Sequence, residues 1–119
     1  MEIKKGDVVE VKKGIIEPDL GEFELSGWKG EITDRYKFEG NYIIEITWNI
    51  ETLQKIPKKF IKESLKDGYS FSKMHLEENE VFKIDEKLDD SKERDRLKRR
   101  LELEQTSGSR NGYDEQDNY

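Results

Sequence analysis

Apolar and polar residues alternate most clearly between residues 27 and 49, where the pattern predicts a β-hairpin. The connection at residues 37–41 contains Gly40-Asn41, a pair that tolerates positive φ. Trp28 and Trp48 stand at opposite ends of the hairpin, so we expect both to be buried on facing strands. The predicted inward face comprises Trp28, Gly30, Ile32, Tyr42, Ile44, Ile46 and Trp48, and the other face comprises Lys29, Glu31, Thr33, Arg35, Ile43, Glu45, Thr47 and Asn49.

Three further strands are predicted on the two sides of the hairpin. After the turn signal Gly6-Asp7, residues 8–12 have high β-propensity, and Val9 and Val11 would face inward. Residues 50–56 predict a turn followed by a short fourth strand. Residues 80–84 predict the closing strand.

One short helix is predicted at residues 58–66. Pro57 suits the first position of a helix, Phe60, Ile61 and Leu65 would share one face, and Gly68 would end it. Residues 69–76 then predict a loop with a helical turn, in which Phe71, Met74 and Leu76 supply apolar contacts.

Residues 14–26 predict a long loop rich in turn formers. Ile15, Leu20, Phe23 and Leu25 are too apolar for a solvated linker, so the loop is expected to fold back over the core. Its carboxylates could hold a hard cation such as Ca²⁺ or serve a hydrolytic enzyme, but their spacing fits no EF-hand, and a solvated acidic loop is the favoured interpretation. These carboxylates belong to Glu17, Asp19, Glu22 and Glu24.

The apolar residues divide the 119-residue chain into two parts. All Trp, Phe and Ile precede Asp85, so residues 1–84 are predicted to form a small β-barrel domain and residues 85–119 a charged tail. In the tail, Leu97 and Leu101 favour only a weak helix, and residues 106–119 are predicted to be disordered. Deletion of everything after Glu86 is therefore expected to change stability by about 1 kcal/mol or less.

Composition excludes several classes of function. Net charge is −6, shared equally between the two parts, which argues against binding driven by phosphate neutralisation. The chain has no cysteine, so it holds neither disulfides nor thiolate metal sites. No apolar run approaches the roughly 18 residues that span a membrane, and residues 1–11 lack the apolar segment of a signal peptide, so a cytoplasmic location is expected.

The order of predicted elements is strand, long loop, hairpin, short strand, helical turn and short strand. With Gly6-Asp7-Val8-Val9-Glu10-Val11 and Trp28-Lys29-Gly30-Glu31-Ile32, it resembles the small Src-homology-3-like barrels, which include KOW and Tudor-like domains. It is also similar to an uncharacterised bacterial group of such barrels. In that group a tryptophan-glycine strand precedes a tryptophan-acidic-serine-x-threonine-leucine segment, here Trp48-Asn49-Ile50-Glu51-Thr52-Leu53, in which Asn49 and Ile50 depart from the pattern. The resemblance implies a mainly β, five-stranded barrel that binds peptides, nucleic acids or proteins.

Candidate binding residues are loop aromatics and lysines. Tyr36, Phe38, Tyr69 and Phe71 are efficient contact residues if exposed, and the alternative is that they cap the ends of the barrel. Lys55, Lys58 and Lys59, with Lys62, form a basic cluster that could contact phosphate or an acidic partner, or be a solvated helix face.

No catalytic or cofactor motif occurs, and His75 has no second histidine or cysteine with which to bind a metal. No catalytic residue, cofactor or metal site is therefore predicted. The leading hypothesis is a non-enzymatic module that binds a protein or peptide. The alternative is a nucleic-acid-binding or ribosome-associated barrel.

Overall fold

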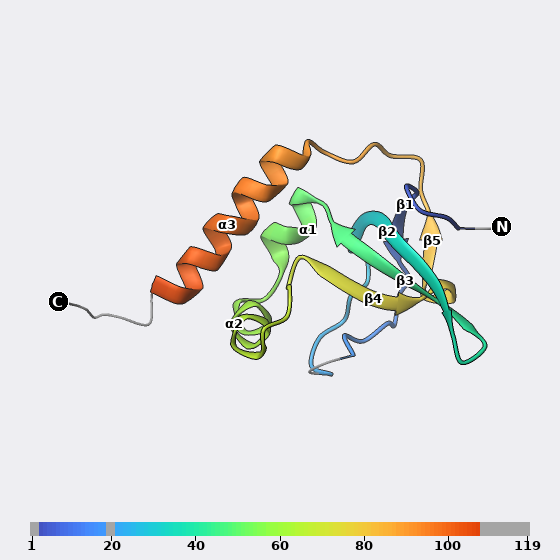
Figure 1. Ribbon diagram of the computed structural model, residues 1–119, viewed down its shortest axis with the longest axis horizontal. Helices are drawn as coiled ribbons and strands as arrows, with labels where there is room; N and C mark the ends of the chain where they lie inside the picture. The colour runs from blue at the N-terminus through green and yellow to red at the C-terminus, as the bar shows by residue number, and fades with distance from the viewer. Residues whose placement is uncertain (1–2, 19–20, 108–119) are drawn as a thin grey trace.

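A five-stranded antiparallel sheet forms the centre of the computed structural model, which describes residues 3–18 and 21–107 (Figure 1). The strands lie side by side in the order β4-β3-β2-β1-β5. Along the chain the elements are β1 (Val8–Val11), β2 (Lys29–Phe38), β3 (Asn41–Trp48), α1 (Ile50–Lys55), α2 (Lys58–Asp67), β4 (Lys73–Glu77), the 3₁₀ turn η1 (Glu78–Glu80), β5 (Val81–Lys83) and α3 (Ser91–Ser107).

The mainly β fold is confirmed, but the sheet is not closed into a barrel, so that part of the prediction is wrong. Strands β4 and β5 follow each other through η1 and form the two opposite edges of the sheet instead of pairing. The prediction of one short helix before the tail is also wrong, because residues 50–55 form a second one, α1, in addition to α2. What remains is an open, barrel-like sheet with helices beside it.

The hairpin of β2 and β3 carries the core as the alternation predicts, except that Tyr42, expected on the inward face, is 41% exposed. The side chains of Trp28 and Trp48 are 5% and 1% exposed, and their rings meet edge to face with centroids 5.2 Å apart. Val9 and Val11 of β1 are also buried against them. The two tryptophans, one just before β2 and one ending β3, therefore join the two arms across the core.

A β-bulge changes the face on which the outer half of β2 presents its side chains. Ile32 pairs with Ile46 but Asp34 pairs with Glu45, so Thr33 is the extra residue. Arg35 then lies opposite the buried Ile44, and its predicted place on the face of Lys29 is wrong. Beyond the bulge, the side chains of Tyr36 and Phe38 lie on the solvent face of the sheet.

Residues 50–55 form α1, with Ile56 as its C-cap, and not the predicted fourth strand. The side chain of Asn49 caps this helix by accepting a hydrogen bond of 2.9 Å from the Thr52 N–H. The strand lies later in the chain, at β4, within the segment predicted to be a loop. Its alternation is short but regular, with Met74 and Leu76 buried and their neighbours exposed.

Helix α2 and the long loop agree with the predictions from the sequence. Gly68 ends α2 with φ of 81°, in the left-handed region that favours glycine. In the loop, Leu25 is fully buried and Phe23 stacks on Trp28, so the described part of the loop folds back over the core. Asp19 and Leu20 lie outside the described residues.

Helix α3 packs against α1 and α2, and Leu97 is only 8% exposed. The expectation that the region after residue 84 buries almost no apolar side chain is therefore wrong for Leu97, while Leu101 is partly buried. The Ile50 N–H at the start of α1 also donates to Asp89 Oδ2 at 2.8 Å. The boundary at residues 84/85 stays a prediction. Of residues 106–119, the first two end α3 and the others lie outside the described residues.

Gly30 is required by the close approach of β2 to β3. A Cβ at this position would lie 2.3 Å from the Thr47 carbonyl oxygen and 2.7 Å from Ile46 Cγ2. Gly30→Ala is therefore expected to lower the free energy of unfolding by about 1–3 kcal/mol, the usual cost of forcing extra volume into a packed interior. Denaturant unfolding measures this cost. An unchanged denaturant midpoint would show that β2 and β3 can move apart to admit the methyl group without a loss of stability.

Candidate functional site

Strand β4 is an edge of the sheet whose backbone groups are left available on one side. The Trp48 N–H donates to the Ser72 carbonyl at 3.0 Å, which places Ser72, Met74 and Leu76 at the hydrogen-bonded positions facing β3. Lys73 and His75 alternate with them, so their backbone N–H and C=O groups point away from β3. Within residues 3–18 and 21–107, no strand pairs with this edge.

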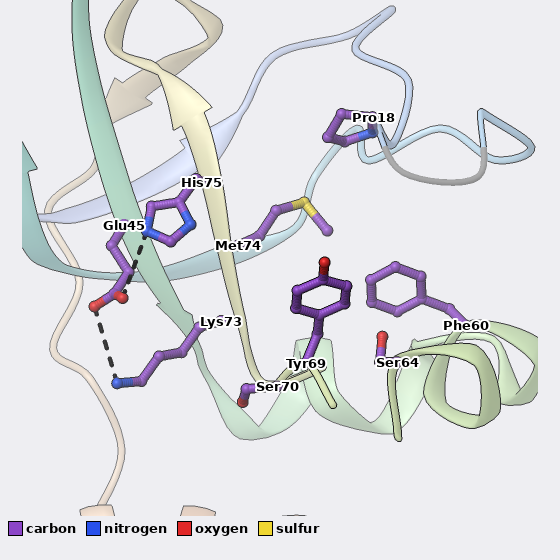
Figure 2. Close-up of a pocket in the computed structure, with 9 residues that line it drawn as sticks. All are labelled: Pro18, Glu45, Phe60, Ser64, Tyr69, Ser70, Lys73, Met74 and His75. Atoms are coloured by element: carbon purple, nitrogen blue, oxygen red, sulfur yellow. Dashed lines mark ion pairs between the residues drawn. The ribbon is translucent and has the colours of Figure 1, made fainter. Parts of the chain in front are cut away.

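A cavity of about 380 Å³ lies beside the first half of β4 (Figure 2). Its apolar contributors include Phe60 of α2 and Met74 of β4, both mostly buried, and Tyr69, whose side chain is 69% exposed. In Figure 2 the Tyr69 ring stands next to Phe60, with Pro18 above it. The complete lining is Pro18, Glu45, Phe60, Ser64, Tyr69, Ser70, Lys73, Met74 and His75.

On the solvent face of the sheet, Glu45 of β3 contacts side chains of both neighbouring strands, β2 and β4. Its carboxylate accepts a hydrogen bond of 2.6 Å from Thr33 Oγ1 and lies 3.6 Å from His75 Nε2 and 3.9 Å from Lys73 Nζ. The ring of Tyr36 meets the imidazole of His75 at a centroid distance of 6.1 Å. These contacts hold the outward side chains of β4 in place beside the cavity.

The sequence-predicted aromatic residues separate into three places. Tyr69 lines the cavity, and Tyr36 extends the site through His75. Phe38 is 58% exposed near the tip of the hairpin. Phe71 is fully buried in the core, so it is not available as a contact residue and matches the capping alternative.

Sequence analysis missed the contribution of β4 itself. Lys73, Met74 and His75 line the cavity, but their segment was predicted to be a loop, so no edge strand was expected there. The signal that could have found it is the alternation of Lys73, His75 and Glu77 with Met74 and Leu76.

The predicted lysines lie near the junction of α1 and α2 and do not line the cavity. Lys55 and Lys58 are exposed. Lys59 Nζ is 2.7 Å from Glu22 Oε1, and this hydrogen bond raises the pKa of Lys59. The cluster therefore has one of its charges already paired.

The carboxylates of the long loop do not gather in the described part of the chain. Glu24 accepts a hydrogen bond of 2.6 Å from the Gly14 N–H, Glu22 pairs with Lys59, and Glu17 is fully buried. Among the described residues no group of three aspartate, glutamate, histidine or cysteine side chains could hold a metal ion. The acidic-loop alternatives thus gain no support from the residues that the structure places.

Comparisons of this chain with protein-family models, with curated proteins and with solved structures found no match. No helix in the described ranges is long and apolar enough to cross a membrane. The functional interpretation therefore depends on the geometry of β4 and its cavity.

Proposed function

We propose that this protein is a non-enzymatic binding module that takes up an extended segment of a protein partner as an added strand on β4. The observation that carries the proposal is the outward direction of the Lys73 and His75 backbone groups at the rim of the cavity. Strand addition to an exposed sheet edge obtains affinity from main-chain hydrogen bonds and specificity from pockets for alternate side chains. Both components are present at this edge.

The arrangement assigns a role to each face of the added strand. A side chain directed to the same side as Met74 would enter the cavity, where Phe60 and Tyr69 offer apolar surface. Its neighbours in the segment would lie on the solvent face, near His75 and Tyr36. We therefore expect the added strand to alternate, with apolar residues on the side of Met74 and polar residues on the side of His75.

The proposal includes a relationship to the Src-homology-3-like folds. The order of β1, long loop, hairpin, short β4, 3₁₀ turn and short β5 supports it, although α1 and α2 lie between the hairpin and β4, and β4 and the turn occupy later residues than the sequence suggested. Peptide recognition in this proposal uses the β4 edge and the adjacent cavity, and it does not depend on closure of the sheet.

His75→Pro is the substitution that tests strand addition. Proline removes the outward N–H of His75, which the protein's own ladder does not use, and proline is tolerated on edge strands for that reason. We expect peptides selected from a displayed random library by the wild-type protein to lose binding to His75→Pro. Peptide titration followed by fluorescence anisotropy measures the loss.

His75→Ala is the matched control, because it removes the imidazole but keeps the backbone N–H. It should bind the selected peptides within a few-fold of the wild-type affinity. Equal affinity of His75→Pro and wild type, with both folded by circular dichroism, would refute strand addition on β4. Failure to select any peptide would count against a peptide-binding function altogether.

A further inference from the structure

The side chains of β4 are arranged symmetrically about His75. On the solvent face, Lys73 precedes His75 by two positions and the oppositely charged Glu77 follows it by two. On the buried face, Met74 and Leu76 are the two flanking apolar residues, both 5% exposed. Such a strand is complementary to itself when read in the antiparallel direction.

We propose that the segment added to β4 is β4 of a second copy of this chain, so that one sheet continues across a symmetric dimer. This inference rests on the proposed function and names the partner at that same edge. With His75 opposite His75 of the second copy, Lys73 lies opposite Glu77 of the second copy. By symmetry, Glu77 lies opposite Lys73 of the second copy. Two cross-strand ion pairs form in this register, and any shift of register would lose them.

The backbone is in the correct phase for this pairing. The residues whose N–H and C=O groups point outward are the odd-numbered ones, and the symmetric register sets odd positions opposite odd positions. The two His75 residues exchange a pair of hydrogen bonds, and each Lys73 N–H meets a Glu77 carbonyl. The Glu77 N–H keeps its existing bond of 2.8 Å to Glu80 Oε1. The dimer ladder therefore forms without breaking that contact.

The cavity supplies the space that a second strand needs. It lies beside Lys73, Met74 and His75, the first half of β4, and Leu76 and Glu77 are not among its lining residues. A twofold axis at His75 brings the second half of the other β4 alongside this first half. The arrangement is isologous, with the same surface used by both copies.

The opposite edge of the sheet lacks this complementarity. The Ile84 N–H donates to the Val8 carbonyl at 2.9 Å. Val81 and Lys83 are therefore the residues of β5 whose backbone N–H and C=O groups point away from β1. Symmetric pairing there would set the buried Val81 opposite Lys83, with no opposite charge to meet it. Self-association through the sheet is therefore specific to β4.

The test is a charge exchange measured by sedimentation equilibrium over a concentration series of the full-length protein. Wild type is expected to dimerise. Lys73→Glu places glutamate against Glu77 of the second copy, and Glu77→Lys places lysine against Lys73. The dimer dissociation constant of each variant alone should therefore be at least about tenfold higher than that of the wild type. An equimolar mixture of the two should regain the wild-type association, because each of its cross-strand pairs is again of opposite charge.

The outcomes distinguish this inference from the proposed function. A wild type that stays monomeric at every concentration overturns the dimer but leaves peptide addition to β4 open to the library experiment. A dimer that survives in both single variants also overturns it, since the copies would then meet elsewhere. If either charge variant is unfolded by circular dichroism, His75→Pro against His75→Ala decides, because only the first should dissociate a β4-paired dimer.

Discussion

Trp48→Ala is expected to lower the free energy of unfolding by about 3–5 kcal/mol, the range for removing a buried large aromatic side chain. Trp48 is 1% exposed and lies at the end of β3, where its ring and that of Trp28 meet edge to face with centroids 5.2 Å apart. The substitution would leave a cavity in the core beside Trp28, whose ring also stacks on Phe23 of the long loop. The free energy of unfolding of a native protein is usually about 5–15 kcal/mol, so the expected loss is a large fraction of the total stability.

Thermal unfolding followed by circular dichroism measures the effect, and Phe38→Ala is its matched control. Phe38 is an aromatic residue of the same hairpin but is 58% exposed, so its removal should change the stability by about 0.5 kcal/mol or less. Equal melting temperatures for Trp48→Ala and wild type would show that the hairpin core is not packed as described.

The hairpin was predictable because its alternation is long and its inward residues are large. Half-buried and buried side chains alternate over residues 43–48 of β3, and a single register buries Ile44, Ile46 and Trp48 together. The bulge at Thr33 was not predictable, because an inserted residue changes the pairing without changing the composition. It moves Arg35 to the other face and thereby makes Tyr36 the neighbour of His75.

The candidate site was harder to predict than the core because its strand is short. Strand β4 has five residues, and only Met74 and Leu76 are buried, so its alternation resembles that of a loop with scattered apolar contacts. Residues 50–55 carry helix and strand formers together, and the capping hydrogen bond that Asn49 Oδ1 accepts from the Thr52 N–H favours α1. In the described ranges, β3 pairs on that side with β4, which follows α1 and α2 along the chain.

Helix α3 gives the second large expected effect. Truncation after Glu86 should lower the free energy of unfolding by about 2–5 kcal/mol, the range for losing a buried leucine, because Leu97 packs with α1 and α2. The truncation also removes Asp89, which accepts the Ile50 N–H at the start of α1. Sequence composition alone suggests a far smaller cost, of about 1 kcal/mol or less, because only four leucines follow residue 84.

Leu97→Ala and Leu103→Ala in the full-length protein identify which surface of α3 is responsible. Leu97 is 8% exposed and Leu103 is 58% exposed on the same helix, so only the first substitution should lower the denaturant midpoint appreciably. If the truncated protein keeps wild-type stability, the domain ends near residue 84 and α3 contributes nothing to it. If the truncated protein and Leu97→Ala lose similar stability while Leu103→Ala does not, α3 belongs to the fold, and Leu97 is its main contact with α1 and α2.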